Sequence, residues 1–425
     1  MMNENCSKVS TVPALPETRY FRWASVLAVL GPGLVVMLAD TDAGSVVTAA
    51  QSGAQWGYKL LLLQFLLMPV LYLVQELTVR LGIFTGKGHG ELISETFGKS
   101  WAYVSVAGLT VATTGALLTE FSGVAGVSEL FGEPRAVGVG LAALTLLVVV
   151  WTGSYRQVER IALAMGGFEI VFFGIAWVSH PDLHAVVDGL VHAPLGNHGY
   201  MTLVAANIGA VIMPWMIFYQ QSAVADKGLH PEDYRAARWD TALGSVITQA
   251  IMAAILIATA ATIGIRNPNA PLNTVQQIAH AFIPYLGNYW GRVVFSLGII
   301  GAGMIAAIVA SLAGAWGWGE VTGFKHSLEH HPLEAPWFYG VYTAIIVVGA
   351  LAVVLIPNLV TLDITVEVMN AFLLPMVLGF LVALAVKALP QGHRISGGYF
   401  WLVTAIATLS AGLGVYGALT TLPGF

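Results

Sequence analysis

The chain has 425 residues, of which 57% are hydrophobic and only 10% are charged, and its mean hydropathy is +0.76. A soluble domain carries about 25% charged residues, so this composition excludes an ordinary soluble protein. The net charge of −5 offers no basic surface for a nucleic acid, and the single cysteine, Cys6, excludes a disulfide framework within one chain.

Apolar runs long enough to cross a bilayer follow a polar tail. Residues 1–20 are predicted to be a disordered tail, and no short apolar core with a small-residue cleavage site marks a signal peptide. Eleven apolar segments then follow, each about as long as a membrane helix or longer. Their predicted bounds are 24–54, 57–82, 101–131, 136–153, 158–179, 202–224, 239–265, 289–318, 336–356, 362–387 and 399–420.

The placement of Lys and Arg tests this count. If the N-terminus is cytoplasmic, fourteen of the 18 basic residues fall in cytoplasmic segments, as the positive-inside rule requires. The pattern therefore predicts a multi-pass protein of the cell (plasma or inner) membrane, with a cytoplasmic N-terminus and an extracellular C-terminus. A count of ten or twelve spans is the alternative.

Two of the segments contain helix-breaking residues. The first holds "GPG" (31–33) and then "DTDAGS" (40–45), and the sixth holds "NIGAVIMPWM" (207–216). Proline inside a helix removes a hydrogen bond and glycine adds freedom. Matching interruptions five segments apart point to an inverted-repeat transporter. Two ordinary proline kinks in a helical bundle are the alternative.

The first interruption also carries two carboxylates, Asp40 and Asp42. A charge at the bilayer centre costs about 3 kcal/mol or more, so it needs compensation. No Lys or Arg lies near these breaks in segments 1 or 6, and Arg80 is expected to pair with Glu76, one turn away. A transported cation is then the simplest counter-charge for the two aspartates.

Three stretches together resemble one known family. They are "GPGLVVMLADTDAGSVVTAAQSGAQWGYKLLLLQ", "RLGIFTGKGHGEL" and "GAVIMPWMIFYQQSAV". This chain is similar in them, and along most of its length, to the Nramp (SLC11-like) divalent-metal transporters. The resemblance implies an all-α LeuT-like fold with eleven transmembrane helices in a 5+5 inverted repeat, with helices 1 and 6 broken. The first repeat would span 21–179, the second 202–387, and the eleventh helix 399–420.

The resemblance also implies a metal site. Asp42 matches the metal-binding aspartate of the family's Asp-Pro-Gly-Asn motif, in which Ala43 replaces the proline and Ser45 the asparagine ligand. Ala210 matches a residue that offers its backbone carbonyl. Met213 aligns with a thioether ligand.

Other family positions differ. Trp215 and Gln220 stand where the family has histidines, and Leu117 replaces an aspartate implicated in proton movement, whereas Glu120 matches a family glutamate. This pattern resembles the Nramp-related magnesium transporter branch. It predicts uncoupled uptake of a partly hydrated ion, with Mg²⁺ and also Mn²⁺ as substrates and no resident cofactor.

Some of the predicted ligands favour Mg²⁺ and another favours Mn²⁺. The shorter side chain of Ser45 leaves room for water and Asp40 adds a second carboxylate, which suits a hard ion that keeps its hydration. A thioether from Met213 suits a softer ion, but that side chain is equally expected to pack beside Pro214.

Four further residues are predicted to line the cavity: Gly44, Trp215, Asn370 and Glu120. Trp215 either caps the cavity or fills space. Asn370 either holds a water of the ion's shell or bonds another helix. Glu120 either belongs to a residual proton path or is a protonated structural residue.

Three other functions stay open at this point. A proton-coupled Mn²⁺/Fe²⁺ importer and an amino-acid transporter of the same fold are transporter alternatives, and Asp42 would repel the carboxylate of an amino acid. A receptor or scaffold is the non-transporting alternative. No His-Glu-x-x-His or Gly-x-Ser-x-Gly motif marks an enzyme. Divalent cations and the lipid bilayer are the expected partners; the oligomeric state is open, with a monomer plausible.

Overall fold

The computed structural model describes residues 31–152, 155–264, 272–279, 283, 287–328 and 330–420, and within them the regular structure is entirely helical. The predicted tail (1–20), Cys6 and the first residues of the first predicted span lie outside these ranges. Ten segments of the described chain are long and apolar enough to span a membrane. One of them, 43–85, turns back at η1 (Gly57–Leu60) and so holds two crossings, which brings the total in the described residues to the predicted eleven.

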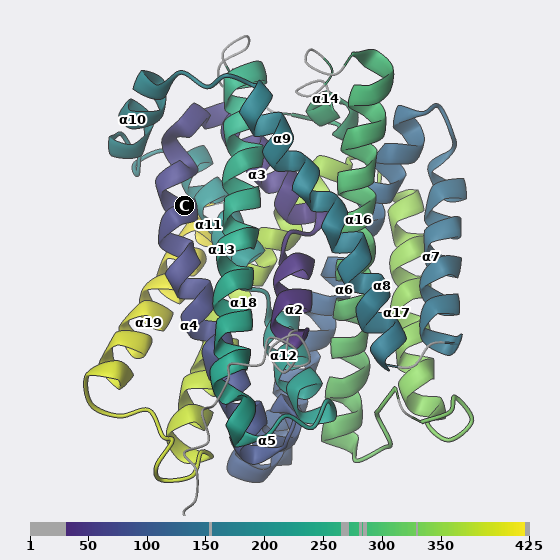
Figure 1. The fold of residues 1–425 in the computed structure, drawn as a ribbon, viewed down its shortest axis with the longest axis vertical. Coiled ribbons are helices and arrows are strands. Elements are labelled where there is room, and N and C mark those ends of the chain that lie inside the picture. Colours follow the sequence, from purple (N-terminus) through teal and green to yellow (C-terminus); the bar gives the residue numbers. More distant parts are fainter. Residues whose placement is uncertain are drawn as a thin grey trace, which may run out of the picture.

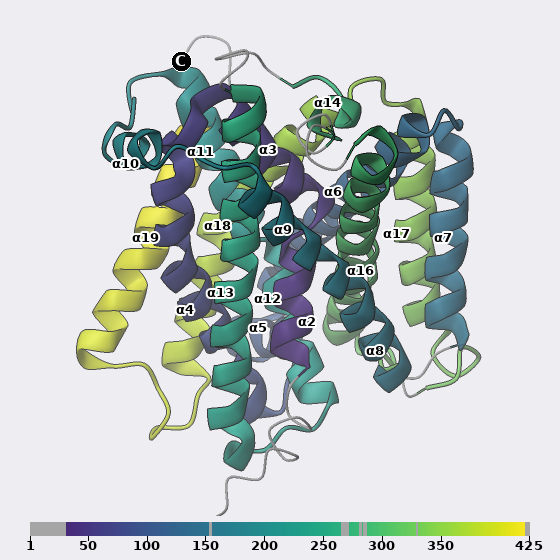
Figure 2. The same ribbon diagram turned by 45° about the horizontal axis from the view of Figure 1, so that its top comes forward.

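The helices run the length of one bundle (Figures 1 and 2). The crossings are α2 (Pro32–Asp40) with α3 (Ala43–Trp56), α4 (Leu61–Thr85), α6 (Lys99–Leu130), α7 (Arg135–Thr152), α8 (Tyr155–Gly166) with η2 (Gly167–Ile170) and α9 (Val171–Val178), α11 (His198–Val211) with α12 (Pro214–Asp226), α13 (Tyr234–Thr259) with η4 (Ala260–Gly264), α16 (Asn288–Thr322), α17 (Pro336–Leu355), α18 (Leu359–Lys387) and α19 (Gly397–Leu419).

Short helices mark the two ends of the bundle. One end carries α5 (His89–Phe97) and is called the α5 end below; the other carries α10 (Leu183–Val191) and α14 (Val275–Ala279) (Figure 1). The stretch between the predicted spans 158–179 and 202–224 contains α10, and Asp182 caps this helix by accepting the backbone N–H of His184 at 2.9 Å. At the α5 end, η3 (Pro231–Asp233) leads into α13.

The two broken helices occupy the middle of the bundle, as both views show. Helix α2 packs against α13 and α16, and α3 packs against α13 and α18. In the most apolar stretch of the segment that contains α11 and α12, 94% of the residues are buried, so protein rather than lipid surrounds it. Irregular backbone is tolerated at membrane depth in such a protein-lined position.

The first break falls at Thr41 and Asp42, between α2 and α3. Asp42 is extended (φ −70°, ψ 175°) and its Oδ1 accepts the backbone N–H of Ser45 at 2.6 Å, which makes it the N-cap of α3. The "GPG" stretch (31–33) lies at the start of α2, where the described residues begin, and Gly31 is the N-cap. Pro32 is the first residue of α2, where its missing N–H costs nothing.

The second break falls at Ile212 and Met213, and here the sequence prediction is confirmed. Pro214 begins α12 and disfavours a helical conformation in the residue before it. Met213 is accordingly extended (φ −89°, ψ 139°). The interrupted helices are the first and the sixth crossings, which matches the predicted spacing; the boundaries of the two repeats remain predictions.

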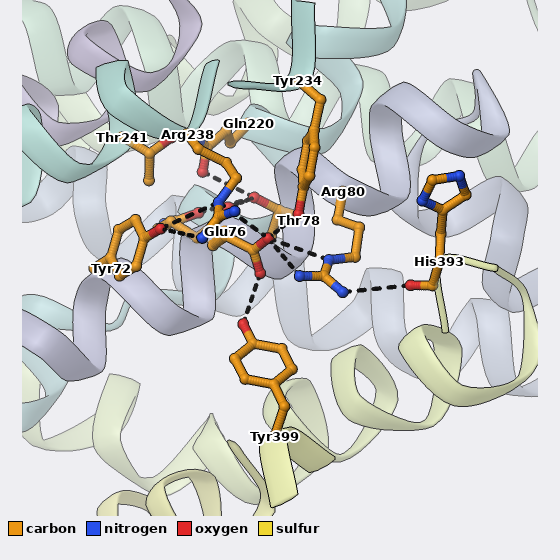
Figure 3. Close-up of polar contacts among 11 residues, drawn as sticks. Tyr72, Glu76, Thr78, Arg80, Gln220, Tyr234, Arg238, Thr241, His393 and Tyr399 are labelled. Atoms are coloured by element: carbon orange, nitrogen blue, oxygen red, sulfur yellow. Dashed lines mark hydrogen bonds and ion pairs between the residues drawn. The ribbon is translucent and has the colours of Figure 1, made fainter. Parts of the chain in front are cut away.

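A buried carboxylate near the α5 end joins three helices (Figure 3). Glu76 of α4 binds the guanidinium of Arg80 at 2.8 Å, so the predicted ion pair is confirmed. It also accepts the hydroxyls of Tyr234 from α13 and Tyr399 from α19. We call these four residues the Glu76 junction.

Close packing of α11 on α18 makes a stability prediction. A Cβ on Gly209 would collide with the backbone carbonyl of Glu367 and lie 2.8 Å from the backbone nitrogen of Ala371. We expect Gly209→Ala to lower stability by about 1–3 kcal/mol, although alanine is the better helix former. Thermal unfolding of the purified protein in detergent measures this change.

The control is Gly199→Ala on the same helix, where the nearest atoms are at 3.4 Å or more. It should leave the unfolding temperature unchanged or raise it. Equal unfolding temperatures for the two variants would show that α11 and α18 are not packed as described.

Candidate metal site

The two breaks meet through three of the predicted site residues. The backbone N–H of Ser45 donates a hydrogen bond to Oδ1 of Asp42, the N-cap of α3. Its hydroxyl donates to the backbone carbonyl of Ala210 at 3.1 Å, across 165 residues of sequence. Asp42, Ser45 and Ala210 are therefore brought together, and the carbonyl predicted to bind metal is hydrogen-bonded to Ser45 in this conformation.

Glu120 reaches the same point from α6. Its Oε2 accepts the backbone N–H of Ala43 at 3.1 Å, and its carboxyl group is a neighbour of the Asp42 carboxyl. Two carboxylates contain only acceptors, so they approach each other stably only with a proton or a cation between them. Glu120 thus stabilises the open backbone at the start of α3 and adds negative charge next to Asp42.

Asp42 is the shared neighbour of a larger group of buried carboxyls. The charge of Asp42 acts on Asp40 in the same break, on Glu169 in η2, and on Asp363 and Glu367 in α18. Together with Glu120 these residues form what we call the acidic cluster, and each has at most 1% of its surface exposed. The six members are Asp40, Asp42, Glu120, Glu169, Asp363 and Glu367.

No positive side chain compensates the acidic cluster within the described part of the chain, because no Lys or Arg is among its buried residues. Several carboxyl oxygens also find no hydrogen-bond donor there. They include both oxygens of Asp40, Oδ2 of Asp42 and Oε1 of Glu367. Buried acceptors without donors are costly, so a cation or its bound water would be favourable at this place.

The cluster does not converge on one point. Among the described residues, no group of three His, Cys, Asp or Glu side chains is arranged to hold one metal ion directly. A direct site in this conformation would have to combine a carboxylate with other donors, such as the Ala210 carbonyl, the Ser45 hydroxyl, the Met213 thioether or water.

Met213 and Trp215 flank Pro214 at the second break, and both are fully buried. The indole Nε1 of Trp215 has no hydrogen-bond partner in the described residues. The geometry is compatible with both interpretations of each residue, and their predicted roles remain predictions.

Gly44 and Asn370 lie against the carboxylate of Glu367. A Cβ on Gly44 would collide with Glu367 Oε1 and would meet Thr119 at 3.1 Å, so glycine leaves room for the Glu367 carboxylate beside α3. Asn370 donates to Glu367 Oε2 at 3.1 Å within its own helix, and its Oδ1 has no partner in the described residues. Among the described residues, the recorded hydrogen bond of the Asn370 side chain is thus within α18, and its role at the cavity remains a prediction.

Three members of the acidic cluster were not among the predicted site residues: Glu169, Asp363 and Glu367. Asp363 and Glu367 are four residues apart, so they share one face of an otherwise apolar helix. That spacing was the available signal for Asp363, whose Oδ1 accepts the hydroxyl of Ser122 at 2.5 Å.

The α5 end of the first broken helix is closed by a second carboxylate. Asp240 Oδ2, on α13, accepts the backbone N–H groups of Gly31, Gly33 and Leu34 at 3.3, 2.9 and 3.2 Å. Beside it, Lys227 and Glu159 form an ion pair at 2.9 Å, and a Cβ on Gly31 would collide with that pair. These contacts fasten the first turn of α2 to the bundle.

A bundle with two interrupted helices and a buried acidic cluster at the interruptions defines a helical membrane protein of the LeuT-like fold. The natural resistance-associated macrophage protein-like (Nramp) family model matches residues 33–420, and the chain belongs to this family.

Similar curated proteins agree with that assignment. The chain is 31% identical over 302 residues to "Divalent metal cation transporter MntH" of Yersinia pestis, covering 68% of this chain and 71% of the relative. It is 31% identical over 304 residues to the protein of the same name from Klebsiella pneumoniae, with the same coverage.

Solved structures show the fold. A manganese transporter mutant of Eremococcus coleocola superimposes with a TM-score of 0.77 at 19% identity, covering 96% of this chain and 90% of that one. MhsT in complex with L-phenylalanine superimposes with a TM-score of 0.60 at 13% identity, covering 94% of this chain and 99% of that one.

The hydrogen bonds between Asp240 and the first turn of α2 lead to a prediction about access to the site. We expect Asp240→Ala to free the first turn of α2, because it removes a carboxylate that accepts three backbone N–H groups. A hydrogen bond to a charged group contributes about 1.5–3 kcal/mol, so opening should become at least about tenfold more frequent. The measurement is the rate at which a maleimide modifies a cysteine introduced by Ser45→Cys, in a Cys6→Ser background.

Asp233→Ala is the matched control. Asp233 accepts the backbone N–H of His230 at the α5 end and does not contact α2 through any recorded bond. If both aspartate variants leave the modification rate unchanged, Asp240 does not hold α2 closed.

Proposed function

We propose that this protein carries divalent metal ions across the cell membrane by alternating access, with the N-terminus cytoplasmic and the α5 end facing the cytoplasm. The family and the names of its relatives support divalent metal transport. The distribution of Lys and Arg supports the orientation. One observation carries the proposal: the acidic cluster is buried at the two breaks without a buried Lys or Arg among the described residues.

We further propose Mg²⁺, partly hydrated, as the principal substrate, with Mn²⁺ also carried. Mg²⁺ dehydrates reluctantly and keeps several waters in proteins. Those waters donate hydrogen bonds, and both oxygens of Asp40, Oδ2 of Asp42 and Oε1 of Glu367 are acceptors without donors in the described structure. In this proposal Asp42 and the Ala210 carbonyl contact the ion, while Asp40 and Glu367 hold its water shell.

The short side chain of Ser45 supports the same substrate. In this conformation its hydroxyl is bonded to the Ala210 carbonyl, so the ion enters when that bond is released or shared. In this proposal Asn370, whose Oδ1 has no partner among the described residues, accepts a hydrogen bond from a further water.

Uncoupled transport is the proposed mechanism. A divalent ion crossing a potential of about 100 mV gains roughly 4.6 kcal/mol, twice the figure for one charge. At about 1.4 kcal/mol per tenfold change, this supports accumulation of about 2,000-fold. An abundant ion therefore needs no proton gradient. The apolar Leu117, at the position of the family's proton-linked aspartate, is consistent with transport that is not coupled to protons.

A proton-coupled Mn²⁺/Fe²⁺ importer is the second candidate. Two observations favour it: Met213 offers a soft ligand at the second break, and the carboxyls of Asp42 and Glu120 are neighbours that can share a proton. An amino-acid substrate is disfavoured, because its carboxylate would meet the acidic cluster.

Asp42→Asn separates ion binding from folding. Asparagine caps a helix as well as aspartate does, so the start of α3 should persist. Removing the charge should weaken Mg²⁺ binding at least tenfold, as measured by calorimetry of Mg²⁺, Mn²⁺ and Ca²⁺ on the purified protein. Unchanged Mg²⁺ binding in a folded Asp42→Asn variant would show that the acidic cluster is not the transport site.

Met213→Ala is the comparison that distinguishes the ions. If the thioether only lines the wall, this variant keeps its Mg²⁺ affinity. A loss of Mn²⁺ binding alone would indicate a thioether ligand, and wild-type protein that binds Mn²⁺ but not Mg²⁺ would exclude the magnesium proposal.

Proteoliposomes loaded with a pH-sensitive dye test the coupling. We expect Mg²⁺ or Mn²⁺ to enter without acidifying the lumen, because the ion alone can follow the membrane potential. The Asp42→Asn protein is the control for leak. Acidification that follows metal entry in the wild type, and is lost in the control, would identify a proton-coupled carrier.

A further inference from the structure

A pocket of about 370 Å³ opens on the outside of the bundle, between α4 and the beginning of α13. It does not involve the acidic cluster, and its function does not depend on the transported ion. The residues that line it are Tyr72, Arg235, Arg238, Trp239 and Ala242.

Arg238 shares the carboxylate of Glu76 with Arg80, so two guanidinium groups face one negative charge and positive charge is in excess at this pocket. Its Nε and NH2 donate to the hydroxyl of Tyr72 at 3.3 and 3.1 Å, which is a neutral partner. The nearest carboxylate, Glu76, is 3.7 Å away and is already bound to Arg80 at 2.8 Å (Figure 3). The charge of Glu76 is thus balanced within the Glu76 junction.

Arg235 adds a second guanidinium, and among the described residues no ion pair or hydrogen bond of its side chain is recorded. The acidic residues just before it are Glu232 and Asp233, and neither lines the pocket. Both arginines lie in the first turns of α13, where the helix dipole disfavours positive charge. Helix stability therefore does not explain them, whereas the dipole and the two guanidinium groups all attract an anion.

Apolar surface continues from the pocket toward the membrane. Trp239 is 66% exposed, and Leu243 and Val246, one and two turns further along α13, are 53% and 46% exposed. Tryptophan and tyrosine are typical of the membrane–water interface, and basic pockets between membrane helices bind anionic lipid headgroups. A soluble anion has no acyl chain to contact this exposed apolar face.

We propose that this pocket binds the phosphate of an anionic glycerophospholipid, with the guanidinium groups of Arg235 and Arg238 on the phosphate and an acyl chain along Leu243 and Val246. Because Arg238 also lies next to Glu76, a bound lipid would brace the junction between α4, α13 and α19 from outside.

Native mass spectrometry of the purified full chain tests the proposal. Wild type, Arg235→Gln and Arg160→Gln are each titrated with dioleoyl phosphatidylglycerol, dioleoyl phosphatidylcholine or glycerol phosphate. Arg160 is an exposed arginine on α8 and is the matched control. We expect preferential binding of phosphatidylglycerol by the wild type and by Arg160→Gln, and about fivefold weaker binding by Arg235→Gln.

Thermal unfolding in lipid-free detergent confirms that the variants are folded, and Trp239→Ala gives a second, uncharged test that should also weaken retention of phosphatidylglycerol. Equal retention of the two lipids by the wild type would overturn the proposal, as would equal loss in Arg235→Gln and Arg160→Gln. Glycerol phosphate that binds as tightly as phosphatidylglycerol would mean a site for a soluble phosphate and would also overturn it.

Discussion

The structure depends on negative charge that is buried at the middle of the bundle and is not neutralised by a buried Lys or Arg in the described residues. Each carboxylate held away from water raises the free energy of the folded protein unless a proton, a donor or a cation offsets it. Helix α3 supplies part of the offset, since the backbone N–H groups of Ser45 and Ala43 bind Asp42 and Glu120. The donors that remain are too few for the oxygens present, and this deficit is the physical basis of a cation site.

Breaking two helices is what makes such a site feasible. A continuous helix satisfies all its own backbone groups in the membrane and leaves none for a substrate. The interruption at Asp42 frees N–H groups that hold carboxylates, and the interruption at Met213 frees carbonyls, among which that of Ala210 accepts only the Ser45 hydroxyl in the recorded hydrogen bonds. Both kinds of group are thereby brought to one place by α3 and α11, which are far apart in sequence.

The sequence predicted these breaks unequally, for physical reasons. Pro214 located the second break closely because proline constrains the residue before it. Pro32 is the first residue of α2, where proline is compatible with a helix, so it does not mark the break at Thr41 and Asp42. Pro69 and Pro375 lie inside α4 and α18, which continue through them. Proline alone was therefore insufficient, and the carboxylates at 40 and 42 were the better indicator.

The site was predictable where its residues are local and less so where packing assembles it. Asp42 and Ser45 share one cap, so a short motif specifies both. Glu169 and Asp363 come from distant helices, and only the fold shows that the charge of Asp42 acts on them. For Asn370 the sequence left two interpretations open, and only the structure shows that its amide binds Glu367 on its own helix.

The two halves of the first broken helix are held in partly different ways. Helix α3 is anchored by close packing, because Gly53 lies against the backbone of Leu256. The first turn of α2 is packed as well, since a Cβ on Gly33 would lie 3.0 Å from the backbone nitrogen of Thr241, and it is also bound by the Asp240 carboxylate, next to the Lys227–Glu159 pair. Packing of this kind has few alternative arrangements, whereas a hydrogen bond to a charged group contributes about 1.5–3 kcal/mol. Any movement of α2 away from α13 therefore has to release Asp240, which makes this carboxylate a contact that controls the position of α2.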